Sequence, residues 1–159
     1  MKDDEIITQI IHSFSNYNLR DIKEINNNQL EFTIAEFILC SCFIDQVSGF
    51  RYNNDKVGKR YRQFIKDYLP NYDPDNLYND LRNKLVHNYS VGGYYGLTRR
   101  SPQLHLKKVK NIIFLNLETF ISDLEDALRK FASELKNDKT IRGNALKWFS
   151  VNKILTQIS

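Results

Sequence analysis

The segment that carries the most chemistry is residues 81–89, LRNKLVHNY, because it places Arg82 five residues before His87. Arginine is a permanent cation whose planar fork binds phosphate oxygens. Histidine is the side chain that gains and loses a proton near neutral pH. The two residue types together suit metal-free cleavage of a phosphodiester. The arginine would hold the phosphate and stabilise the charge that develops on it, and the histidine would move the proton.

A helix must position this pair. Asp73-Pro74 predicts a helix start, with Asp as the N-cap and Pro at the first helical position. The core stripe of this helix consists of three leucines spaced by four, Leu77, Leu81 and Leu85. On an ideal α-helix five residues turn the direction by roughly 140°, so Arg82 and His87 would flank that stripe. They face one cleft only if the helix loosens near His87 or if the cleft straddles the stripe.

The residues around the pair distinguish it from a chance match. Asn83 directly follows the arginine and shares a helix face with His87, so it is a candidate to orient the imidazole. Tyr89 stands two residues after the histidine. The same spacing recurs from Arg100 to His105, but that copy contains a proline and lies outside the helical pattern. The first copy is therefore the predicted catalytic pair.

With these residues, the segment resembles the signature of the HEPN family, an Arg followed by four to six residues and a His. The version with Asn after the Arg and Tyr two residues after the His resembles the HEPN toxins found beside minimal nucleotidyltransferase antitoxins. The resemblance implies an all-helical bundle that dimerises about a two-fold axis, with the motifs meeting at the interface. It also implies a metal-independent endoribonuclease without a cofactor. Tyr89 would correspond to the tyrosine that the partner enzyme modifies with AMP.

A dimer also has a chemical rationale. Cleavage of RNA by its own 2′-hydroxyl needs a base for the nucleophile and an acid for the leaving oxygen. One chain offers one histidine at the site, whereas two copies across a symmetric interface offer two. We therefore expect a composite site that leaves 2′,3′-cyclic phosphate ends.

Basic residues after the motif are the predicted contacts to the RNA backbone. They are Arg99, Arg100, Lys107 and Lys108. An earlier basic cluster also suits RNA backbone contact, although the outer face of an ordinary amphipathic helix is the simpler expectation. It contains Lys56, Lys59, Arg60, Arg62 and Lys66.

Simpler interpretations stay open for each site residue. Arg82 could be a surface residue paired with Asp80, and His87 a cation that favours the end of the helix dipole. Tyr89 could be a packing residue. Asp45 could support the site, although a solvent-exposed carboxylate is the simpler expectation. In that case the chain is a catalytically inactive HEPN-like module that binds a nucleotide, RNA or a protein.

Composition limits the remaining classes. The 159 residues fit one domain, 1–159, and 42% hydrophobic residues are enough for a core. The net charge of +4 permits an anionic partner without requiring one. The two cysteines, Cys40 and Cys42, predict buried thiols, and the sequence holds no metal-binding pattern. The longest apolar run, 38–44, is too short for a membrane span, and the acidic start does not resemble a secretory signal, so the expected location is the cytoplasm.

The fold class predicted from periodicity is all-α, a bundle of about five to six helices with a small β-hairpin or ordered loop inserted after helix four. The inserted segment is Tyr94–Leu106. The helices are expected over 3–15, 29–47 with Gly49 as the stop, 56–69, from 74 onward, 117–135 with Asn116 as the cap, and 141–158.

Overall fold

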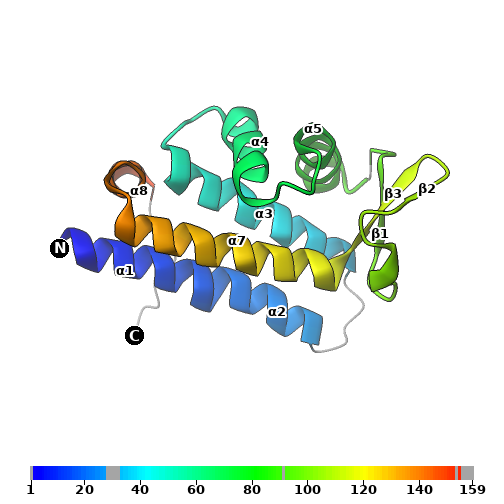
Figure 1. Cartoon of the computed structure of the whole chain (residues 1–159), viewed down its shortest axis with the longest axis horizontal. Coiled ribbons are helices and arrows are strands. Elements are labelled where there is room, and N and C mark those ends of the chain that lie inside the picture. Colours follow the sequence, from blue (N-terminus) through cyan, green and yellow to red (C-terminus); the bar gives the residue numbers. More distant parts are fainter. Residues whose placement is uncertain (1, 28–32, 91, 153, 155–159) are drawn as a thin grey trace.

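Helices dominate the computed structural model, and one small sheet interrupts them, as the sequence predicts (Figure 1). The structure describes residues 2–27, 33–90, 92–152 and 154. The N-terminal half contains α1 (Asp3–Ser13), the π-helix η1 (Phe14–Leu19), α2 (Arg20–Asn27), α3 (Thr33–Tyr52), α4 (Val57–Tyr68), α5 (Pro74–Leu77), the π-helix η2 (Tyr78–Leu85) and α6 (Val86–Asn88). The second half contains β1 (Tyr95–Thr98), the 3₁₀ turn η3 (Pro102–Leu104), β2 (Lys108–Val109), β3 (Ile112–Asn116), α7 (Leu117–Asn137) and α8 (Lys139–Val151).

Two long helical segments lie side by side in the bundle. The first runs through α1, η1 and α2, so the helix predicted over 3–15 continues to Asn27. The second is α7, which lies alongside it (Figure 1). The apolar face of α7, which includes Leu117, Phe120 and Leu124, is buried. The side chain of Asn116 caps this helix, as predicted, by accepting a hydrogen bond from the backbone N–H of Thr119 at 3.0 Å.

The central helix is α3, which packs against α4, α7, α8 and η2. Phe37 of α3 stacks on Phe120 of α7 with ring centroids 6.0 Å apart, and both are fully buried. Each such burial contributes roughly 2 kcal/mol. By length and composition α3 is also apolar enough to cross a membrane. Its contacts on several sides are those of the core helix of a globular protein.

The predicted stop of α3 at Gly49 is wrong, because the helix continues to Tyr52. Gly49 is needed for packing instead. A Cβ at that position would lie 2.6 Å from the indole of Trp148 in α8, so glycine lets the two helices approach closely. The predicted helix over 141–158 is observed as α8 from Lys139 to Val151; its expected last residues, 153 and 155–158, lie outside the described residues.

The insertion is built differently from a simple hairpin of 94–98 with 104–106. Its first strand, β1, pairs in parallel with β3, and β2 pairs antiparallel with β3, which gives the order β1-β3-β2. The stretch 102–104 forms η3, because Pro102 lacks an N–H for a strand and favours the first position of a helical turn.

Asp80 fixes the insertion to the helix that precedes it. This fully buried carboxylate accepts hydrogen bonds from the backbone N–H groups of Tyr94 and Tyr95 at 2.9 and 3.0 Å. Gly92 makes room for it, since a Cβ there would lie 1.7 Å from Asp80 Oδ1. Asp80 is thus an anchor of the insertion and not the partner of Arg82.

Candidate functional site

The predicted catalytic pair comes together because the helix between the two residues is wound as a π-helix. Asp73 caps α5 as expected, accepting from the N–H of Asn76 at 2.7 Å, and η2 follows over Tyr78–Leu85. In a π-helix each N–H bonds to the carbonyl five residues earlier, so each turn contains more residues than an α-helical turn and residues five apart point in more similar directions. This winding places Arg82 and His87 on one face, which an ideal α-helix would not do.

Arg82 and His87 are in direct contact. Arg82 Nη1 donates a hydrogen bond to His87 Nε2. A guanidinium has only donors, so the imidazole nitrogen facing it carries no proton. His87 is exposed, near the end of α6, and Arg82 is partly buried. The pair therefore presents a lone pair able to accept a proton beside a cation able to bind a phosphate.

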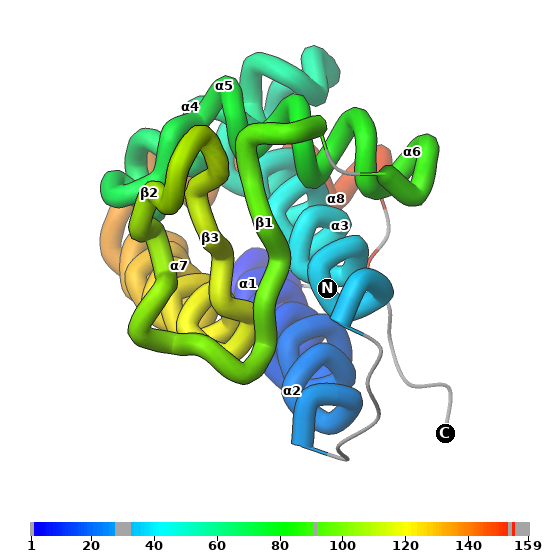
Figure 2. The backbone as a smooth tube through the Cα atoms, turned by 90° about the vertical axis from the view of Figure 1, so that its right-hand side faces the viewer, coloured from blue at the N-terminus to red at the C-terminus, as the bar shows by residue number. Residues whose placement is uncertain are grey.

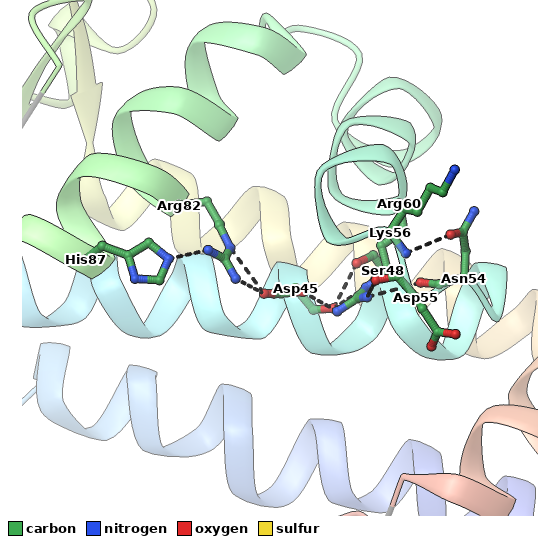
Figure 3. A network of polar contacts seen from close by, with 8 residues as sticks. All are labelled: Asp45, Ser48, Asn54, Asp55, Lys56, Arg60, Arg82 and His87. Atoms are coloured by element: carbon green, nitrogen blue, oxygen red, sulfur yellow. Dashed lines mark hydrogen bonds and ion pairs between the residues drawn. The ribbon is translucent and has the colours of Figure 1, made fainter.

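Asp45 of α3 is the residue that fixes this arrangement (Figure 3). Its Oδ2 accepts from Arg82 Nε at 3.4 Å and from Arg82 Nη2 at 3.3 Å. Its Oδ1 accepts from Arg60 Nη2 at 2.5 Å. The Asp45 side chain is only 22% exposed, so it is a shared anion between two arginines and not a free surface carboxylate.

Arg60 of α4 is the second arginine that Asp45 binds. Its Nη1 donates to the backbone carbonyl of Asn54 at 3.0 Å, and its guanidinium lies 5.1 Å from the centre of the Trp148 ring. Because the side chain is only 10% exposed, Arg60 is not part of a basic outer face. Two cations and one anion leave this cluster with one net positive charge, which favours an anionic ligand.

The two predicted supporting residues have different environments. Tyr89 ends α6 in the left-handed conformation, with φ 53°, and its side chain is 66% exposed, so it is not a packing residue. Asn83 is half-buried and makes no hydrogen bond to His87 within the described part of the chain. The His87 ring is hydrogen-bonded to Arg82 instead.

Arg99, a predicted RNA contact, is directed into the protein. Its Nη2 donates to the carbonyl of Asn26 at 2.6 Å and to Glu36 Oε1 at 3.2 Å. The Glu36 carboxyl is fully buried, and burial raises its pKa while Arg99 opposes that rise. Arg99 therefore joins the insertion to α2 and α3.

The other three predicted RNA contacts, Arg100, Lys107 and Lys108, are exposed. Lys108 begins β2, and Figure 2 shows β2 on the far side of the sheet from α6. The structure does not bring β2 together with Arg82 and His87.

His105 has partners that the sequence does not reveal. Its Nδ1 accepts from the backbone N–H of Asn116 at 3.1 Å, so the proton of the neutral ring lies on Nε2. Nε2 lies 2.9 Å from Tyr72 Oη, and the Tyr72 hydroxyl donates to Asp123. Burial lowers the pKa of His105, with Asp123 opposing this effect. This histidine is a structural link between η3, the segment before α5, and α7.

A hollow of 330 Å³ adjoins the network, and Asp45 and Arg60 form part of its wall. Gln46, Trp148 and Asn152 are among its other lining residues. Cys42 also lines it and is exposed, unlike the buried Cys40, so the expectation of two buried thiols is wrong for Cys42. Burial and Asp45 raise the pKa of the Cys42 thiol, and Arg82 opposes them.

Metal ligands are not gathered at this site. Among the residues that the structure describes, no three His, Cys, Asp or Glu side chains are grouped to hold a metal ion. Comparisons with protein-family models, curated proteins and solved structures found no match.

Proposed function

We propose that this chain is a metal-independent endoribonuclease of the HEPN type that acts in the cytoplasm as a toxin or in phage defence. The observation that carries the proposal is the contact between Arg82 and the unprotonated Nε2 of His87, held in place by Asp45. A fixed cation beside an accessible proton acceptor supplies the phosphate anchor and the base that phosphodiester cleavage by the RNA 2′-hydroxyl requires.

The reaction follows from these groups. A phosphate oxygen displaces His87 from Arg82 Nη1, because an anion is a stronger hydrogen-bond partner than a neutral ring. His87 Nε2 then takes the proton of the 2′-hydroxyl, and the 2′-oxygen forms a bond to phosphorus. The bond from phosphorus to the 5′-oxygen breaks, and that oxygen takes up a proton. The products are a 2′,3′-cyclic phosphate and a 5′-hydroxyl.

The leaving 5′-oxygen needs a proton donor, and we propose that it is the same histidine of a second copy. His87 and Tyr89 are both exposed, so the end of α6 is accessible to another chain. A symmetric dimer would place two arginines and two histidines at one interface. A monomer in solution at working concentration would contradict this part of the proposal.

The exposed Tyr89 phenol is also accessible to a modifying enzyme. We propose a nucleotidyltransferase antitoxin as partner, which would attach AMP to this hydroxyl. The added phosphate would compete for Arg82 and occupy the site of the RNA phosphate.

The test uses purified protein, excess chelator and RNA oligonucleotides of varied sequence. We expect cleavage to persist in chelator and to leave cyclic phosphate ends detectable by mass. An otherwise identical 2′-deoxy oligonucleotide should stay intact. Loss of cleavage in chelator, or cleavage of the deoxy substrate, would contradict the mechanism.

A catalytically inactive binding module is the second candidate, because Asp45 and His87 already occupy Arg82 in the absence of RNA. It predicts that RNA binds and is never cut. In that case Arg82→Ala would reduce RNA binding, and His87→Ala would leave it unchanged.

A further inference from the structure

The hollow beside Asp45 has the chemistry of a site for a flat, polar ring. Its 330 Å³ lies within the range of small-molecule sites. The Trp148 indole forms one wall of the hollow, and the Arg60 guanidinium lies over this ring, 5.1 Å from its centre. Aromatic rings and arginine planes are the surfaces on which proteins stack the unpaired bases of single-stranded RNA.

Two amides give the hollow a polar edge. Gln46 uses its Oε1 to accept from Asn18 Nδ2 at 2.9 Å, and its own Nε2 donates to none of the described residues. Asn152 uses its Nδ2 to donate to the Trp148 carbonyl at 3.3 Å, and its Oδ1 accepts from none of them. The hollow thus offers one N–H donor group and one acceptor oxygen, and the Watson–Crick edge of each nucleobase presents donors and acceptors in its own arrangement.

The hollow is adjacent to the reacting groups. Asp45 contributes one carboxylate oxygen to Arg60, on the hollow's wall, and the other to Arg82, which contacts His87. Figure 3 shows Asp45 between Arg82 and Arg60, so a nucleotide whose phosphate lies on Arg82 would need to extend past one aspartate to reach the hollow that Arg60 lines.

We propose that this hollow holds the nucleobase next to the phosphate that Arg82 binds, and that Gln46 and Asn152 give the cleavage its base preference. The inference rests on the ribonuclease function proposed above. Gln46 and Asn152 act here as specificity residues, since neither contacts Arg82 or His87 in the described residues.

The experiment uses Trp148 as its reporter, because it is the only tryptophan of the chain. The full-length protein is titrated with the four ribonucleoside monophosphates, each as the 3′ and the 5′ phosphate, and Trp148 fluorescence is recorded. We expect a saturable change in Trp148 fluorescence for at least one base.

Gln46→Glu keeps an oxygen for Asn18 and replaces the donor group by an acceptor, so the preferred nucleotide should bind about 3- to 10-fold more weakly. Gln103→Glu adds the same charge at an exposed position of η3 and should leave binding unchanged.

A parallel assay compares cleavage of oligonucleotides that differ in one base, by the wild type and by Gln46→Glu. A shift of preference with a preserved melting temperature supports the pocket. If RNA is cut but no nucleotide changes Trp148 fluorescence, or if Gln46→Glu and Gln103→Glu behave alike, the pocket is overturned and the ribonuclease stands. If nucleotides bind with the expected sensitivity but no RNA is cut, the ribonuclease is overturned and the hollow remains a nucleotide site.

Discussion

Arg82–His87 and Arg100–His105 have the same spacing in sequence, yet the structure separates their roles. In the first pair a π-helix connects the two residues and turns both side chains to one face, where they touch. In the second pair a 3₁₀ turn intervenes and directs His105 inward, onto Tyr72 and the backbone of Asn116.

The difference shows what makes a histidine available for proton transfer. Both ring nitrogens of His105 have partners within the protein, and the ring is half-buried. His87 is exposed, and its only hydrogen bond within the described chain is to Arg82, which a phosphate can displace. Spacing alone does not distinguish the two pairs; the backbone between the residues does.

The largest effect on catalysis apart from loss of His87 itself should come from Arg82→Lys. Lysine keeps the charge but loses the fork that contacts Asp45 and His87 together, so we expect the cleavage rate to fall about 100-fold. Arg129→Lys, at an exposed arginine of α7, is the matched control and should cleave at the wild-type rate. Equal rates for the two variants in a single-turnover assay would remove Arg82 from the proposed catalytic pair.

Asp45→Asn should have the next largest effect. Without the anion, Arg60 and Arg82 repel each other and Arg82 loses its fixed direction, so we expect cleavage to fall about 10- to 100-fold. Asp123→Asn changes the polar chain of His105 in the same way and should leave the rate unchanged. Normal cleavage by Asp45→Asn would show that the shared carboxylate does not position Arg82.

The two histidines should exchange roles when stability is measured: His105 should matter for folding and His87 should not. His105→Ala leaves the Asn116 N–H without its acceptor and the Tyr72 hydroxyl with Asp123 alone, which lowers the free energy of unfolding by about 1–3 kcal/mol. His87→Ala removes an exposed side chain and should change it by no more than about 0.5 kcal/mol. Urea denaturation of both variants measures this directly, and equal losses would mean that His87 is also structural.

The pH dependence of stability isolates His105 further. Burial lowers its pKa in the folded state, so below about pH 6.5 the unfolded chain takes up a proton that the folded chain excludes. Stability is therefore full above that pH and declines as the pH falls through and below it. The decline between pH 7 and 5 should be smaller in His105→Gln than in the wild type. Identical declines would assign the effect to other groups.

Much of the fold could be predicted because its signals are local. The Asp73-Pro74 start, the Asn116 cap and the helix over 117–135 depend on neighbouring residues, and the structure confirms all three. Gly49 misled the prediction because its role is set by Trp148, far away in the chain. The pairing of β1 was equally non-local, since its partner β3 comes after the predicted insertion.

The candidate site was predictable only in part. Residue types and spacing selected Arg82 and His87, and the need for a loosened helix was foreseeable from the α-helical period. The leucine spacing does not reveal the π-helix, because a step of four residues fits an α-helix as well as a π-helix. Asp45 joins two arginines 15 and 37 residues later, so only the packing of α3 against α4 and η2 reveals it as the centre of the network.

The most direct measurement is the rate of RNA cleavage in chelator by the wild type, His87→Ala and His105→Ala, compared at a temperature where all three are folded. We expect His87→Ala to cut at least 100-fold more slowly and His105→Ala to cut at the wild-type rate. If His87→Ala cuts as fast as the wild type, or if His105→Ala loses activity equally while folded, the assignment of catalysis to Arg82 and His87 is wrong.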